Sequence, residues 1–182
     1  MMNNRIDPLE VQFGLAHDCI RACIYGNYIA KSNIKKDAWL SILDMCYSDA
    51  IISWNAIFEA NSQNSHWKKL VMKAPAPERS TLKPFCKTMI IEYLETTETE
   101  WDSYHAMMVD IRNNRLAHFN HLKDIAEPPN ITWALHSAYL YREWLLSLLR
   151  AYQKSGLPIK ISETTGKEML TIFNSQIEEI CK

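Results

Sequence analysis

Scarcity of glycine is the feature that most constrains how this chain can fold. The sequence has 4 glycines in 182 residues, and neither Asn-Gly nor Asp-Gly occurs. Two-residue β-hairpins rely on those dipeptides, because both central positions of the commonest turn need a positive φ. An antiparallel sheet built from tight hairpins is therefore disfavoured, and a helical fold is expected.

Apolar residues recur instead at steps of three and four, between breaks that contain proline. Asp7 and Pro8 are suited to the N-cap and first helical position of the first segment, and Thr97 or Thr99 can cap the fifth. The second segment, which starts at Asp37, is apolar on more than one face and is predicted to lie centrally. The predicted helical segments are 5–32, 35–60, 61–73, 85–97, 97–122, 131–156 and 162–182.

No repeat, low-complexity tract or linker divides the chain, so residues 1–182 are predicted to form a single domain. The expected fold class is all-α, a bundle of about five to seven helices. Apolar residues make up 47% and charged residues 23%, which is typical of a globular protein. The net charge of −1 excludes a broad basic surface, so any contact with nucleic acid must come from a local patch.

Five scattered cysteines without a Cys-x-x-Cys pair make a disulfide framework or a zinc site unlikely, and Cys19 and Cys23, four residues apart in an apolar pattern, are expected to be buried free thiols. The N-terminus lacks an apolar signal region, and no uncharged apolar run approaches about 18 residues. We therefore expect a cytoplasmic protein with no membrane partner.

A basic cluster interrupts this pattern in residues 107–124, where Arg112, Arg115, His118 and His121 lie within ten positions. One interpretation is a solvated helix end, because cations are favoured there by the helix dipole. The other interpretation is a functional site that binds a phosphate. On an ideal α-helix Arg112 and His118 lie about 120° apart. They would therefore need a bend, or a second copy of the chain, to act together.

The run IRNNRLAHFN resembles the signature of the HEPN superfamily (higher eukaryotes and prokaryotes nucleotide-binding), and it is most similar to the AbiU2-like branch. The residues that match are Arg112, Asn113, Ala117 and His118, with five residues between Arg112 and His118. The resemblance implies a HEPN-like helical bundle and a metal-independent endoribonuclease that works as a homodimer, without a cofactor. It also implies a toxin or effector in a toxin–antitoxin or phage-defence system, with a nucleotidyltransferase-like antitoxin as a candidate partner.

The same resemblance assigns roles to the matching residues. His118 would act as the acid–base residue in forming a 2′,3′-cyclic phosphate, since an imidazole titrates near neutral pH. Arg112 would hold the scissile phosphate and stabilise its developing charge. Asn113 would orient the histidine or the phosphate. Arg115 is an additional phosphate contact by position, and His121 a weaker one.

A second basic stretch contains His66, Trp67, Lys68 and Lys69. Cations around an aromatic side chain suit single-stranded RNA. The alternative, which we favour, is an amphipathic helix whose apolar residues, Leu70 among them, face inward while the lysines are solvated. The group of His136, Tyr139, Tyr141 and Arg142 is best explained by a helix facing the core.

No metal site is expected, because His118 and His121 have no carboxylate at ligand spacing. Two further hypotheses stay open beside the ribonuclease. One is a HEPN-fold module that binds nucleotides, RNA or protein without catalysis. The other is a helical interaction protein whose Arg–His cluster is a solvated helix end.

Overall fold

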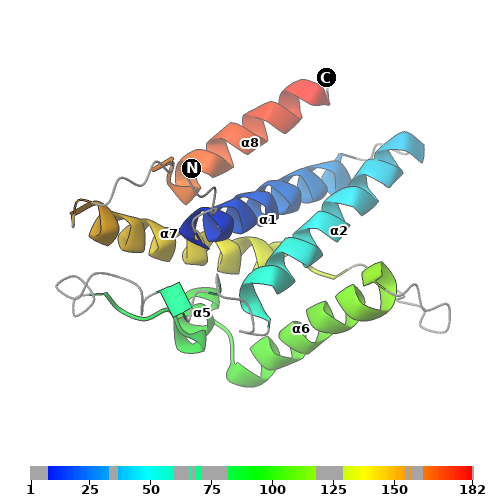
Figure 1. Cartoon of the computed structure of the whole chain (residues 1–182). Helices are drawn as coiled ribbons and strands as arrows, with labels where there is room; N and C mark the ends of the chain where they lie inside the picture. Colours follow the sequence, from blue (N-terminus) through cyan, green and yellow to red (C-terminus); the bar gives the residue numbers. More distant parts are fainter. Residues whose placement is uncertain are drawn as a thin grey trace, which may run out of the picture.

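All regular secondary structure in the described part of the chain is helical, which confirms the expected all-α bundle. The computed structural model describes residues 8–32, 37–59, 66, 69–70, 82–117 (backbone alone for 115–117), 129–154, 156 and 162–181. Within those residues there are six α-helices and one π-helix, and no strand. The elements, labelled as in Figure 1, are α1 (Pro8–Lys31), α2 (Asp37–Phe58), α5 (Lys87–Leu94), α6 (Glu98–Ile111), the π-helix η1 (Arg112–Ala117), α7 (Thr132–Lys154) and α8 (Gly166–Ile180).

Helix α1 is the central element, and it contacts α2, α7 and α8 (Figure 1). Gly26 lies on the face of α1 that meets its neighbours. A Cβ atom added at Gly26 would lie 3.2 Å from Cδ1 of Ile131 and 3.4 Å from Cβ of Cys46. Glycine at this position therefore avoids a tight contact with Ile131, just before α7, while the contact with α2 would be an ordinary one.

The predicted central position of α2 is wrong for its first half. Two of its apolar side chains point to solvent, since Ile42 is 40% exposed and Met45 is 68% exposed. Burial of α2 begins at Ala50 and continues through Trp54 and Ile57. Only this second half lies where α1, α6 and α7 converge, so apolar residues on more than one face did not indicate burial along the whole helix.

Trp54 joins three helices in the core. Its side chain is fully buried, and its Nε1 donates a hydrogen bond of 2.9 Å to Oγ of Ser137 on α7. The rings of Phe58, Trp101 and Tyr104 surround it, with centroids 5.1, 5.7 and 5.6 Å from that of Trp54. Trp54 thus combines a large buried apolar area with a satisfied polar atom, which is the favourable way to bury an indole.

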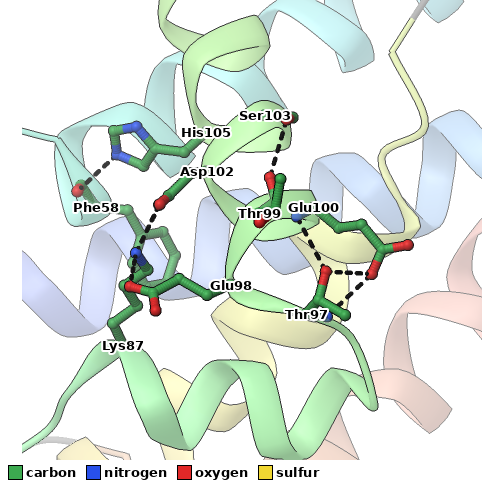
Figure 2. A network of polar contacts seen from close by, with 9 residues as sticks. All are labelled: Phe58, Lys87, Thr97, Glu98, Thr99, Glu100, Asp102, Ser103 and His105. Carbon is green, nitrogen blue, oxygen red and sulfur yellow. Dashed lines mark hydrogen bonds and ion pairs between the residues drawn. The ribbon is translucent and has the colours of Figure 1, made fainter.

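The helix ends follow the sequence signals. Thr97 caps α6, which settles the choice between Thr97 and Thr99, and its hydroxyl and backbone N–H form a capping box with Glu100 (Figure 2). Thr165 and Glu168, which have the Thr-x-x-Glu spacing of a capping box in the sequence, form one at the start of α8. Gly156, with φ of +80°, lies just after α7, as expected for a C-terminal glycine.

Polar contacts fix α6 against its neighbours (Figure 2). Lys87 on α5 donates to Glu98 at 2.7 Å and to Asp102 at 2.8 Å. His105, further along α6, places Nε2 3.2 Å from the carbonyl oxygen of Phe58, the last residue of α2. The C-terminal end of α2 is thereby held beside α6. No helix in the described ranges is long and apolar enough to cross a bilayer.

The two halves of α2 should respond differently when a large side chain is shortened to alanine. Trp54→Ala should lower the free energy of unfolding by about 3–5 kcal/mol, because it opens a cavity in the aromatic core. Met45→Ala, the matched control on the exposed half, should change it by no more than about 0.5 kcal/mol. Urea unfolding followed by circular dichroism measures both. Equal losses from the two variants would contradict this description of α2.

The two capping boxes predict a specific loss of stability in acid. Hydrogen bonds from Thr97 lower the pKa of the Glu100 carboxyl below 4.5, and those from Thr165 do the same for the pKa of Glu168. A carboxyl whose pKa is lower in the folded state stabilises the fold at neutral pH. That stabilisation is lost as pH falls below the ordinary value and through the folded-state pKa.

The double variant Glu100→Gln/Glu168→Gln should therefore lose less stability than the wild type between about pH 5 and pH 3. Thermal unfolding across this range is the measurement. Glu178→Gln removes an exposed carboxylate of α8 that takes part in neither capping box, and it controls for net charge. An unchanged acid response in the double variant would show that the capping carboxylates do not cause the loss.

Candidate functional site

The backbone changes its helical form where the Arg–His cluster begins. The α-helix α6 ends at Ile111, and residues Arg112–Ala117 form a π-helix. The predicted uninterrupted α-helix from residue 97 to 122 is therefore wrong at Arg112–Ala117, and its last five residues, 118–122, lie outside the described residues. Asparagine is a weak helix former because its amide competes with the backbone for hydrogen bonds, and two asparagines occur in succession here. Single π-turns occur frequently at functional sites.

Arg112 is the best-defined member of the cluster. Its guanidinium forms an ion pair with both carboxylate oxygens of Glu59, and Nη2 donates to Oε1 at 2.6 Å. Nε and Nη2 also donate to Oδ1 of Asn113, at 3.1 and 2.8 Å. Two edges of the planar guanidinium are thus occupied. The Arg112 and Glu59 side chains are 31% and 23% exposed, so one side of the pair still meets solvent.

Glu59 reaches Arg112 because the end of α2 is anchored to α6. Asn55 is 1% exposed, and its Nδ2 donates to the carbonyl oxygens of Ile51 at 2.8 Å and Met108 at 3.1 Å. The backbone N–H of Glu59 then donates to the carbonyl oxygen of Asn55 at 2.9 Å. Together with the contact between His105 and Phe58, these bonds place the carboxylate beside the first residue of the π-helix.

Asn113 and Asn114 support the turn in different ways. Asn113 accepts from Arg112, so it holds the guanidinium, whereas the resemblance implied that it orients the histidine or the phosphate. Asn114 donates from Nδ2 to Oδ1 of Asp110, one turn earlier, at 2.6 Å. The polar side chains at the start of the π-helix are therefore engaged in local contacts.

The structure describes the other predicted site residues only in part. His118, His121, Trp67 and Lys68 lie outside the described residues, and Arg115 is described by its backbone alone. His66 is 2% exposed, so an RNA strand would not reach its ring in this conformation.

Lys69 and Leu70, the next described residues after His66, are partly or fully covered as well. Lys69 is half-buried. Leu70 is 2% exposed, as the amphipathic interpretation of this stretch expected.

The group on α7 matches its structural interpretation. Tyr141 and Arg142 are buried, and His136 is exposed. Among the cysteines, Cys19 and Cys23 are buried free thiols as predicted, and burial raises the pKa of Cys23. Within the described ranges, no three His, Cys, Asp or Glu side chains gather in a way that would hold a metal ion.

Glu59 is the residue of this site that the sequence analysis missed. It lies 53 residues before Arg112, and nothing in its immediate sequence distinguishes it from a solvated helix end. Only the packing of α2 on α6 brings the carboxylate to the guanidinium. Comparison with known proteins does not add to this picture: no family model, no curated protein and no solved structure matches the chain.

The ion pair predicts a measurable coupling between Glu59 and Arg112. A double-mutant cycle of Glu59→Ala and Arg112→Ala should give a coupling energy of about 1 kcal/mol, the upper end for incompletely buried pairs. The reason is the bidentate geometry and the anchoring of both helix ends. Lys87 and Glu98, a more exposed pair, form the control cycle and should couple by no more than about 0.5 kcal/mol. A coupling of zero at Glu59 would show that it does not hold Arg112.

Proposed function

We propose that this chain is a metal-independent endoribonuclease of HEPN type that acts as a homodimer, with Arg112 and His118 as its catalytic residues. The single observation that carries the proposal is the fixed position of Arg112, held by Glu59 and Asn113 at the start of a π-helix that spans the Arg-Asn-Asn-Arg-Leu-Ala part of the matching run. Orienting a guanidinium in advance lowers the cost of using it to stabilise charge in a transition state.

The proposed reaction needs only groups of this chain and of RNA. The ribose 2′-oxygen attacks the adjacent phosphorus, and the bond from phosphorus to the 5′-oxygen breaks. His118 accepts the proton of the 2′-hydroxyl or protonates the leaving 5′-oxygen, and the second proton transfer falls to the other copy's histidine or to water. Arg112 stabilises the extra negative charge on the phosphoryl oxygens. The products are a 2′,3′-cyclic phosphate and a 5′-hydroxyl.

The homodimer supplies what one copy lacks in this proposal. Most N–H groups of the Arg112 guanidinium already contact Glu59 or Asn113. The outer N–H of Nη1 is left without a partner among the described residues. One such donor is a weak clamp for a phosphate. Two copies of the motif facing each other across a two-fold axis would double the cationic and imidazole groups around one phosphodiester.

The ion pair also favours a second candidate function, a non-catalytic module that binds RNA, nucleotides or protein. The Glu59 carboxylate neutralises Arg112 and would compete with a phosphate for the same guanidinium edge. A site of this kind suits weak binding better than stabilising a transition state. Glu59→Gln separates the two functions: in a binding module it should raise RNA affinity without creating cleavage.

Cleavage of labelled single-stranded RNA in EDTA tests the ribonuclease. The purified chain should release fragments that end in a 2′,3′-cyclic phosphate. His118→Ala should reduce the cleavage rate by about 10²–10⁴-fold, because it removes the acid–base group. Arg112→Ala should reduce it by about 10²–10³-fold, because it removes the charge that stabilises the transition state.

His136→Ala and Arg150→Ala, both exposed on α7, are the matched controls and should leave the rate unchanged. Cleavage that survives His118→Ala would rule out catalysis at this site. RNA binding without cleavage at any pH would favour the binding module. If neither is seen, and alanine at Arg112, Arg115, His118 and His121 alters neither binding nor dimerisation, the cluster is a solvated helix end.

A further inference from the structure

Arg142 on α7 is a buried cation without a carboxylate partner. Its side chain is 4% exposed, and no acidic side chain forms an ion pair with it among the described residues. Nε and Nη2 donate to the carbonyl oxygen of Thr164 at 3.1 and 2.8 Å, and the guanidinium carbon lies 5.0 Å from the centroid of the Phe13 ring. Burial lowers the pKa of Arg142, and the charge of Glu143 partly offsets that effect. Buried charges are usually paired, so this one calls for an explanation.

A cavity adjoins Arg142, and residues of α1, α7 and α8 line it. Its volume is about 280 Å³, and its lining includes His17, Arg142, Ser162, Thr164, Met169 and Phe173. A water occupies about 30 Å³ in the liquid, so the cavity is large enough for a small organic molecule. Its walls combine thioether and aromatic surface from α8 with the cation from α7, the usual composition of a ligand site.

Two nitrogen atoms around this cavity keep unused capacity for hydrogen bonds. Nη1 of Arg142 has no acceptor among the described residues, since the contacts with Thr164 use Nε and Nη2. His17 turns Nδ1 toward Oδ1 of Asp18 at 3.2 Å, and its Nε2 has no partner in the same part of the chain. The His17 ring is held edge-to-face against Phe173, with the centroids 5.2 Å apart. A polar end and an apolar wall therefore lie next to each other.

We propose that this cavity binds a small carboxylate with an apolar body, its carboxylate on Nη1 of Arg142 and its body against Met169 and Phe173. The proposal is independent of the ribonuclease, because the cavity shares no residue with the Arg112 site. A monoanion balances the single buried cation. The bound carboxylate would also make this burial of charge less costly, because a paired, hydrogen-bonded charge is far better tolerated than an isolated one.

Neighbouring hydrogen bonds argue for a carboxylate over a phosphate. The start of α8 would be the natural place for phosphate oxygens, because its N–H groups point outward. Here the N–H of Gly166 donates to Oε1 of Glu143 at 2.8 Å, and that of Glu168 donates to Oγ1 of Thr165 at 3.2 Å. The Glu143 carboxylate would also repel a doubly charged group. A dianion would thus find one cation and few free donors.

Benzoate and hexanoate are the probes, titrated into the full-length chain and followed by calorimetry and by amide chemical shifts. Both should bind saturably at one site per chain. Benzamide, which has the same shape as benzoate without its charge, should bind at least about tenfold more weakly, because the charge-assisted hydrogen bond is lost. Inorganic phosphate should bind more weakly than benzoate. The absence of saturable binding by both carboxylates, or a preference for phosphate, would overturn the proposal.

Substitutions locate the binding. Arg142→Gln keeps an amide that can donate to Thr164 but removes the charge, and it should weaken benzoate binding about tenfold or more. Arg150→Gln, an exposed position on the same helix, is the matched control and should leave affinity unchanged. Ile172 lines the cavity and is 45% exposed, so Ile172→Trp should narrow the cavity and block binding without unfolding the chain. If the Arg142→Gln variant does not fold, the Ile172→Trp variant still tests the site. Benzoate binding that is unchanged in Ile172→Trp would refute this site.

Discussion

Burial of the Trp54 indole is the interaction on which the rest of this structure depends. A large aromatic side chain contributes most when all of its surface leaves water and its N–H finds an acceptor, and Trp54 meets both conditions through Ser137. Because the ring contacts residues of α6 and donates to α7, it fixes the second half of α2 between them. The first half of α2 has no comparable anchor, and it remains exposed despite its apolar side chains.

The candidate site is a consequence of that anchoring. Once Trp54 is in place, Asn55 lies within reach of the Met108 carbonyl and the carbonyl of Phe58 lies within reach of His105. The chain leaving α2 is then directed toward the end of α6, where Glu59 meets Arg112. A change in the aromatic core would therefore displace the site without altering any residue in it. The stability of the fold and any chemistry at Arg112 are therefore linked through the contacts between α2 and α6.

Two arginines in this chain illustrate different ways to accommodate a charge. Arg112 has a carboxylate and an amide oxygen, so its charge is compensated within the protein. Arg142 has a backbone carbonyl and an aromatic face, and in the described part of the chain it forms no ion pair, although the charge of the nearby Glu143 acts on it. The first arrangement positions a cation for use at a surface. The second leaves a cation whose compensation would come from a bound anion.

For the described residues, the sequence alone predicted the α-helices and most of their boundaries, because caps and apolar periodicity act over a few neighbouring residues. Thr97, Thr165 and Gly156 mark helix ends where the local chemistry placed them. Local pattern failed where the deciding contacts are distant. The exposure of Ile42, the π-helix at Arg112, the pairing of that arginine with Glu59 and the cavity at Arg142 were settled by how whole helices pack. The partner of a charge depends on which surfaces meet in three dimensions, and that choice was made only by the tertiary structure.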